Sequence, residues 1–253
     1  MKKHLLVLLA TAIVYLPNTF AAKITVVTEE MPPYNFKDEK SRSITGMSTE
    51  IVKEILRRSH LDYSIELYPW AKSYRLAQDN PNVAIYSIAR SADREKKFKW
   101  VGAVALRTVY LYKLKDRTDL NVKKLDDLKP YKLGGIRDGV RTQYLVDRGF
   151  TVETVSDDAN NIIKLQTKKI DAFPADELAL AALSEKHGFD YGSMEKLMKL
   201  DEVSGSLYLA FSLKTPDETV EKCRAALESM KKDGVFDRLA AKWQPKSKSN
   251  NIK

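Results

Sequence analysis

Short β-branched runs alternate with amphipathic runs along most of the chain. Ile24–Thr28 is rich in β-branched residues and predicts a strand. A helix is expected from Ser48 onward, because apolar residues repeat at helical spacing from Ile51 to Leu56. The same order returns several times and predicts an α/β fold with open, mostly parallel sheets flanked by helices. Further strands are expected at 63–67, 83–89, 108–114, 131–136, 150–155, 170–173 and 206–212, and further helices at 69–77, 140–148, 157–169, 176–187, 215–233 and 236–243.

These elements form two groups, joined by extended segments near 112–118 and 200–206. Neither segment is a Gly/Ser linker, so we expect two crossing strands with limited hinge freedom. Thr215 and Glu218 have the spacing of a capping box, with Pro216 at the first helical position. That pattern predicts the start of the helix that ends before Gly234.

Residues 1–22 have the layout of a secretory signal peptide. Lys2 and Lys3 precede an apolar run over 5–15, and small residues end at Ala22. The run is too short to cross a bilayer core of about 30 Å. We expect cleavage after Ala21 and a periplasmic mature protein, ending in a flexible tail over 246–253.

Composition excludes several functional classes. The 253-residue chain has a single cysteine, which rules out an internal disulfide and a Cys-based zinc site. Its three histidines are scattered, and no phosphate-loop, nucleophile-elbow or dinucleotide-binding motif is present. The net charge of +9 falls to about +7 without Lys2 and Lys3. Lys and Arg alternate with Asp and Glu along the predicted helices, which indicates solvated surfaces; no cofactor, metal or nucleic-acid partner is expected.

Five segments carry motifs that resemble one family. They are EMPPYNF at 30–36, GMSTEIV at 46–52, SIARSADREKKFKW at 87–100, KKIDAFPAD at 168–176 and VFDRLAAKW at 235–243. In this order they resemble the bacterial extracellular solute-binding proteins of family 3, the polar amino-acid type that serves ABC importers. The resemblance implies a two-lobed periplasmic binding protein fold with a two-strand hinge and the ligand between the lobes. Lobe 1 would comprise 23–112 plus 206–245, and lobe 2 would comprise 113–205.

The resemblance also implies roles for two charged residues. Arg94 matches the arginine that holds the ligand's α-carboxylate, and a guanidinium offers paired donors in the plane of a carboxylate. Asp176 matches the aspartate that receives the α-ammonium group. Alternatively, Arg94 forms a surface ion pair with a neighbouring acid, and Asp176 is simply the N-terminal cap of the helix that follows.

Further candidates would line the same cleft. Aromatic walls are expected from Tyr34 and Trp70, and less strongly from Tyr86, although each could be a core residue. Arg137 and Arg141 lie where the family has a Gly-Thr turn at a helix start. Arg90 would be a second anion contact or would pair with an acid such as Glu66. The complete set of expected ligand-binding residues is Tyr34, Trp70, Tyr86, Ser87, Arg90, Arg94, Arg137, Arg141 and Asp176.

Two departures from the family pattern leave the ligand open. Ala89 and Val140 stand where the family has hydroxyl groups. The extra arginines suggest an anionic solute as an alternative to an amino acid. The expected function is capture of a small polar or anionic solute by a monomer that delivers it to an inner-membrane ABC permease. The alternatives are an enzyme on the same scaffold, such as a cyclohexadienyl dehydratase-like lyase, and a component that presents ligand to a sensor.

Overall fold

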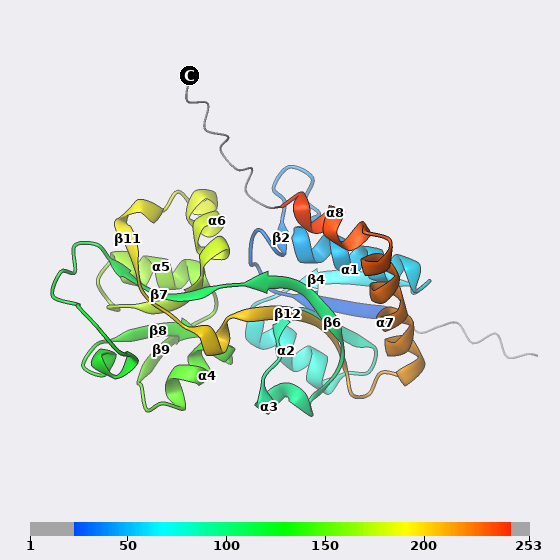
Figure 1. Ribbon diagram of the computed structural model, residues 1–253, viewed down its shortest axis with the longest axis horizontal. Coiled ribbons are helices and arrows are strands. Elements are labelled where there is room, and N and C mark those ends of the chain that lie inside the picture. The colour runs from blue at the N-terminus through cyan, green and yellow to red at the C-terminus, as the bar shows by residue number, and fades with distance from the viewer. Residues whose placement is uncertain (1–22, 244–253) are drawn as a thin grey trace, which may run out of the picture.

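The computed structural model describes residues 23–243, which form two lobes joined by extended chain (Figure 1). The predicted signal peptide and tail lie outside the described residues. Lobe 1 contains a five-stranded sheet in the order β4-β1-β5-β12-β6. Its strands are β4 (Tyr63–Leu67), β1 (Ile24–Thr28), β5 (Val83–Ala89), β12 (Gly205–Ser212) and β6 (Phe98–Arg107).

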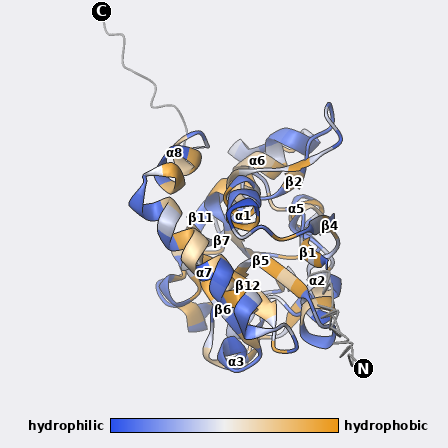
Figure 2. Cartoon of the chain, turned by 90° about the vertical axis from the view of Figure 1, so that its right-hand side faces the viewer, coloured by the Kyte–Doolittle hydropathy of each residue, from blue (hydrophilic) through white to orange (hydrophobic). Residues whose placement is uncertain are grey.

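The lobe 1 sheet is mixed rather than mostly parallel. β1 runs parallel to β4 and β5, but β12 is antiparallel to both β5 and β6. Helices cover both faces, and apolar strands β5 and β12 lie between them (Figure 2). The helices of this lobe are α1 (Met47–Arg58), α2 (Trp70–Asp79), α3 (Ala92–Glu95), α7 (Asp217–Lys232) and α8 (Val235–Ala241), and a small hairpin pairs β2 (Phe36–Lys37) with β3 (Ile44–Thr45).

Cys223 is buried in the lobe 1 core, as its place on the apolar side of α7 predicts. Ile51, Val52, Ile55 and Leu56 of α1 are buried in the same core. Helical spacing places these four residues on one side of the helix, and burial of such a stripe is the main source of helix stability in a folded protein.

Lobe 2 is built around β7 (Val109–Leu114), which pairs antiparallel with β10 (Phe173–Asp176) and β11 (Met194–Lys199). A parallel pair, β8 (Leu133–Ile136) and β9 (Val152–Val155), continues the sheet through a bridge between Leu133 and Ala172. The helices of this lobe are α4 (Val140–Val146), α5 (Asp158–Gln166) and α6 (Glu177–His187), with short 3-10 turns η1 (Leu125–Leu128), η2 (Tyr191–Ser193) and η3 (Asp201–Val203).

The chain crosses between the lobes twice. β6 ends at Arg107 and β7 begins at Val109, so the expected boundary at 112 falls inside a strand of lobe 2. The return crossing lies between η3 and β12, close to the expected 206. The backbone N–H of Val109 donates to Ser204 Oγ at 2.9 Å, which ties the two crossings together. Figure 1 shows the β6–β7 ribbon running from one lobe to the other beside the start of β12.

Three local predictions differ from the structure. β11 was not predicted, because Met194–Lys199 mixes apolar and charged residues without clear alternation. Pro174 lies within β10 rather than at a turn after it, and it is opposite Leu111. The prediction of a capping box before α7 is wrong. Pro216 is the N-cap residue, and the buried hydroxyl of Thr215 has no hydrogen-bond partner among the described residues.

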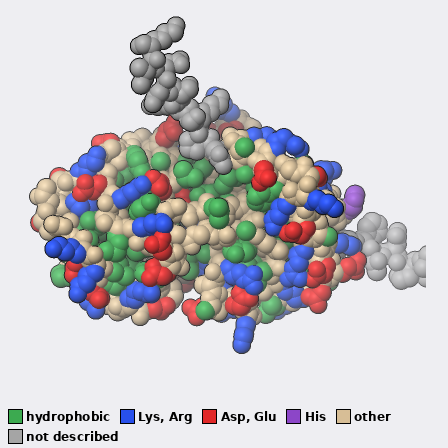
Figure 3. All heavy atoms as spheres, in the orientation of Figure 1, with side chains coloured by type: hydrophobic (Ala, Val, Ile, Leu, Met, Phe, Trp, Pro, Cys, Tyr) green, Lys and Arg blue, Asp and Glu red, His purple; other side chains and the backbone are tan. Residues whose placement is uncertain are grey.

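Charges are spread over the molecule. On the face shown in Figure 3, Lys and Arg side chains are interspersed with Asp and Glu. This mixture agrees with solvated helix surfaces. Within residues 23–243, no helix combines the length and apolar character that a membrane crossing requires.

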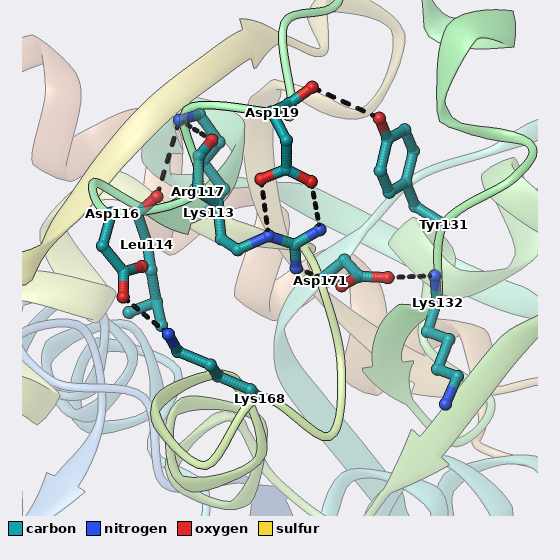
Figure 4. A network of polar contacts seen from close by, with 9 residues as sticks. All are labelled: Lys113, Leu114, Asp116, Arg117, Asp119, Tyr131, Lys132, Lys168 and Asp171. Atoms are coloured by element: carbon teal, nitrogen blue, oxygen red, sulfur yellow. Dashed lines mark hydrogen bonds and ion pairs between the residues drawn. The ribbon is translucent and has the colours of Figure 1, made fainter.

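A polar network fixes the loop after β7 to the rest of lobe 2 (Figure 4). Asp171 accepts the backbone N–H of Lys132 at 2.7 Å and pairs with the guanidinium of Arg117. Arg117 also binds both carboxylate oxygens of Asp119, at 2.9 and 2.8 Å. The side chains of Arg117 and Asp171 are 20% and 19% exposed, whereas that of Asp119 is 60% exposed.

We expect Asp171→Asn to lower the free energy of unfolding by about 1–2 kcal/mol, because a charge-assisted bond is lost at a partly buried site. Urea denaturation measures this change. The control is Asp119→Asn, which should cost less because the Asp119 side chain is itself 60% exposed. Equal losses from the two variants would contradict the proposed importance of Asp171.

Candidate functional site

Residues of both lobes enclose a small cavity of about 20 Å³. This is about the room that one water molecule needs. Lobe 1 contributes Glu29, Trp70, Ser87, Ala89, Arg94 and Arg107, and lobe 2 contributes Ile136, Gly139, Val140 and Arg141. The lobe 1 residues lie in, at the end of or just after strands β1, β5 and β6, or on helices α2 and α3.

Arg94 lies at the centre of this contact between the lobes. It is only 6% exposed, so it is not a surface ion pair. Its guanidinium donates to the carbonyl of Ala89 at 3.2 Å and, across the cleft, to the carbonyl of Asp138 at 3.1 Å. It also lies 5.0 Å from the ring centroids of Trp70 and Tyr74. Burial lowers the pKa of Arg94, and a guanidinium nevertheless stays charged at neutral pH.

Asp176 serves as a helix cap and also faces the other lobe. One carboxylate oxygen accepts the backbone N–H of Ala179 at 2.8 Å, which caps α6. The other accepts the Tyr34 hydroxyl of lobe 1 at 3.3 Å. Burial raises the pKa of this 1% exposed side chain, while the bond from Ala179 opposes that rise. The two alternative roles of Asp176 are therefore compatible.

Two aromatic candidates contact the opposite lobe through polar atoms. The indole N–H of Trp70 donates to the Asp138 carbonyl at 2.8 Å. The Tyr34 hydroxyl lies 3.0 Å from the carbonyl of Leu106 as well as near Asp176. Ser87 lines the cavity with a φ of 57°, and its buried hydroxyl has no hydrogen-bond partner within residues 23–243.

Three predicted residues are placed away from the cavity. Tyr86 points to the opposite side of β5 from Ser87, where its hydroxyl lies 2.8 Å from that of Thr49 in the lobe 1 core. Arg90 lies beyond the end of β5, is exposed, and pairs with Glu95 rather than with Glu66. Arg137 is also exposed.

Arg141 is close to the cavity, but its guanidinium is already paired. It binds Asp158 of α5 at 2.7 Å, and the two side chains are 9% and 8% exposed. This pair lies within lobe 2 and joins the start of α4 to the start of α5. The pair uses Nη2 of Arg141, whereas Nη1 is buried with no hydrogen-bond partner among the described residues, so Arg141 stays a candidate ligand contact.

Sequence reasoning missed Glu29 and Arg107. Desolvation raises the pKa of Glu29 to about 7, and this outweighs the opposing attraction of Arg141. Burial lowers the pKa of Arg107 to about 10, and repulsion by Arg141 adds to the effect. Glu29 follows the carboxyl end of a parallel strand, where ligands often bind, and that signal could have identified it. Arg107 showed no such signal, because its position depends on how the two crossings between the lobes pack together. Its guanidinium donates to the carbonyl of Val203, beside the return crossing, at 3.0 Å.

The contact between the lobes therefore collects six ionisable side chains of balanced sign. Four of them are buried, while Glu29 and Arg107 are partly buried. The six side chains lie close together: four line the same cavity, a fifth pairs with one of those four, and the sixth accepts a hydroxyl group from the opposite lobe. They are Glu29, Asp158, Asp176, Arg94, Arg107 and Arg141. Within residues 23–243, no group of three or more His, Cys, Asp or Glu side chains is arranged to hold a metal ion.

The comparison with known proteins agrees with this architecture. A model of the bacterial extracellular solute-binding proteins, family 3, matches residues 24–246. The chain belongs to this family. The arginine-binding periplasmic protein of Mannheimia haemolytica is 25% identical over 96% of this chain and 98% of its own. The L-cystine-binding protein TcyA of Bacillus subtilis is 23% identical over 87% of this chain and 80% of its own.

Solved structures confirm the two-lobed fold. An ancestral arginine-binding protein bound to arginine superposes with a TM-score of 0.74 and 21% identity, covering 88% of this chain and 98% of that one. A histidine kinase sensor domain with similarity to periplasmic binding proteins gives a TM-score of 0.77 at 17% identity, covering 87% and 95% of the two chains. At these identities the likeness establishes the fold alone.

In this solute-binding protein, one further ion pair joins the lobes at the rim of the cleft. Glu30, which follows β1 in lobe 1, pairs with Lys186 of α6 in lobe 2, and the two side chains are 25% and 23% exposed. A pair this exposed contributes about 0.5–1 kcal/mol. The pair stabilises the contact between the lobes rather than the fold of either lobe.

We expect Lys186→Met to increase the population of separated lobes about two- to fivefold, because an attraction between the lobes is lost while side-chain length is kept. Small-angle X-ray scattering should show a larger radius of gyration. Lys196→Met is the matched control, since Lys196 pairs with Glu177 inside lobe 2. The interpretation fails if both variants scatter like the parent protein.

Proposed function

We propose that this protein captures an amino-acid-like solute between its lobes in the periplasm and delivers it, as a monomer, to an inner-membrane ABC importer. The observation that carries the proposal is the set of three acids and three bases at the contact between the lobes, four of them buried and two partly buried. A zwitterion adds one positive and one negative group to such a site and leaves its net charge unchanged. Relatives named for arginine and cystine support a ligand of this class.

In this proposal Arg94 receives the α-carboxylate and Asp176 the α-ammonium group. Arg94 donates to main-chain carbonyls, so its paired N–H groups can turn to a carboxylate without breaking an ion pair. Asp176 lies on lobe 2 and Arg94 on lobe 1. A ligand that binds both therefore stabilises the contact between the lobes, which is the hinge closure typical of this architecture.

The structure weakens the case for an anionic solute. That alternative depended on Arg90, Arg137 and Arg141. Arg90 and Arg137 are exposed away from the cavity, and Arg141 is neutralised by Asp158. Arg107 adds a cation to the cavity wall, but Glu29 adds an acid beside it.

A thermal-shift screen of the mature protein tests the proposal. Free ligand at a hundred times its dissociation constant should add about 2.7 kcal/mol to stability. The screen should contain the common L-amino acids, L-cystine, and dicarboxylates such as succinate, with hits measured by calorimetry. We expect amino acids to bind and dicarboxylates to have no effect. Binding of dicarboxylates alone would overturn the proposal.

A second function is favoured by one observation, the pKa of about 7 at Glu29. A carboxyl group poised near neutral pH suits general acid–base chemistry. Incubation with prephenate or arogenate, followed by detection of an aromatic product, tests a dehydratase on this scaffold. Product formation that is lost in Glu29→Gln would support the enzyme.

A further inference from the structure

A larger hollow lies beside the cavity, also between the lobes. Its volume is about 450 Å³, compared with about 20 Å³ for the cavity. Glu29 and Trp70 line both spaces. Arg141 lines the cavity, while its partner Asp158 lines the hollow. The two spaces are therefore neighbours separated by these four side chains, and a ligand bound in the first can extend into the second.

The wall of the hollow is mainly apolar and comes from both lobes. Lobe 1 contributes the segment 67–69 that leads into α2. Lobe 2 contributes Ile163 of α5, Leu183 of α6 and Phe189. Such a wall suits an aliphatic chain, because contact with it removes apolar surface from water.

The charged residues of the hollow are all acidic. Among the described residues that line it, four are carboxylates and none is Lys or Arg. Asp158 is engaged by Arg141 and Glu30 by Lys186, which leaves Asp157 as a partly exposed acid with no ion-pair partner among the described residues. The uncompensated negative charge at the outer part of the hollow therefore comes from Asp157 of lobe 2.

We infer that the hollow holds the ligand's side chain, and that the ligand is an amino acid with a long, unbranched aliphatic side chain that ends in a positive charge. The inference rests on the proposed function, which places the α-carboxylate and α-ammonium groups at Arg94 and Asp176. The aliphatic stem passes Trp70 and lies against Ile163 and its neighbours. The positive end reaches the outer part of the hollow, near Asp157.

A homologous series of amino acids tests the stem. Calorimetry with L-alanine, L-norvaline and L-norleucine should show affinity rising about two- to fourfold per methylene, because each added group is removed from water. L-lysine, which adds an ammonium group to the norleucine skeleton, should bind more tightly still. Equal affinities across the series would overturn the inference while leaving the proposed function intact. Absence of binding by every member would instead count against the proposed function.

Filling the hollow tests its location. Ile163 is 46% exposed on α5, so Ile163→Trp adds bulk without disturbing a core. We expect this variant to keep its affinity for L-alanine and to lose most of the gain from L-alanine to L-norleucine. Val146→Trp is the matched control, because Val146 is also 46% exposed but lies on α4 outside the hollow. Retention of the full gain in Ile163→Trp would contradict the placement.

Removing one acid tests the positive end. Asp157 caps α5 by accepting the backbone N–H of Asn160 at 3.0 Å. Asp157→Asn keeps a good capping residue and removes only the charge. We expect the ratio of L-lysine to L-norleucine affinity to fall about two- to fivefold, as for a partly exposed ion pair. Glu153→Gln removes a charge outside the hollow and should leave the ratio unchanged. An unchanged ratio in Asp157→Asn would overturn the assignment of Asp157.

Discussion

Replacing Arg94 with alanine is expected to lower the affinity for an amino-acid ligand by at least about 100-fold. Each charge-assisted bond that its buried guanidinium makes to a carboxylate contributes on the order of 1.5–3 kcal/mol, and a paired contact makes two of them. The ligand would then be bound by Asp176 of the opposite lobe alone, and it would no longer join the two lobes. Calorimetry with the strongest amino-acid ligand from the screen measures the loss.

Arg90 provides the matched control for this experiment. It lies four positions earlier, is exposed, and is paired with Glu95. Arg90→Ala should therefore leave affinity within about twofold, as expected for a solvent-exposed pair remote from the ligand. Circular dichroism checks that Arg94→Ala remains folded, since the change also removes bonds to the carbonyls of Ala89 and Asp138. Parental affinity in a folded Arg94→Ala variant would mean that the ligand binds elsewhere.

Glu29→Gln is expected to stabilise the protein at pH 8 by about 3 kcal/mol and to have little effect at pH 4. Burial raises the pKa of Glu29 from 4.5 to about 7, so the folded protein holds a proton that the unfolded chain has already released between these values. A tenfold difference in proton affinity between the two states corresponds to about 1.4 kcal/mol. The stability of the parent protein therefore falls as the pH rises through this window, and the loss is complete above it. Glutamine is neutral throughout and avoids that loss.

Urea denaturation at pH 4, 6 and 8, without added ligand, measures this dependence. Glu39→Gln, at an exposed position, is the control and should follow the parent protein at every pH. The parent and Glu29→Gln curves should converge toward pH 4 and separate steadily above pH 5. Parallel curves would show that the carboxyl group of Glu29 is well solvated in the folded protein.

Short local motifs led to Arg94 and Asp176, and the structure places both at the contact between the lobes, while their roles toward a ligand stay predictions. Each lies at or just after a strand end, and the segments around them carry family motifs. Arg90 and Arg137 have the same chemistry as Arg94. The sequence alone cannot distinguish these two arginines from Arg94, because the burial of each side chain depends on the direction that it takes beyond the end of its strand. Arg141 was placed near the cleft, but its pairing with Asp158 joins two helix starts whose approach is a tertiary feature.

Glu29 and Arg107 show the complementary limit. Glu29 has an acidic neighbour, Glu30, and nothing local indicates that one carboxyl group is desolvated while the other forms an ion pair at the rim. Arg107 ends β6 at a crossing whose position was expected several residues later. The direction of β12 was unpredictable for a related reason, since a strand's neighbours determine whether it runs parallel or antiparallel.

The place of β12 in lobe 1 has a consequence for biosynthesis. This strand lies between β5 and β6, yet it is made after the whole of lobe 2. Until about residue 212 has left the ribosome, β6 has no hydrogen-bonded neighbour in its sheet and one edge of β5 remains unpaired. Lobe 2 is continuous in the chain and can assemble first, whereas lobe 1 must wait for β12 to join β5 to β6. A nascent chain halted before β12 should therefore be a preferred client of chaperones.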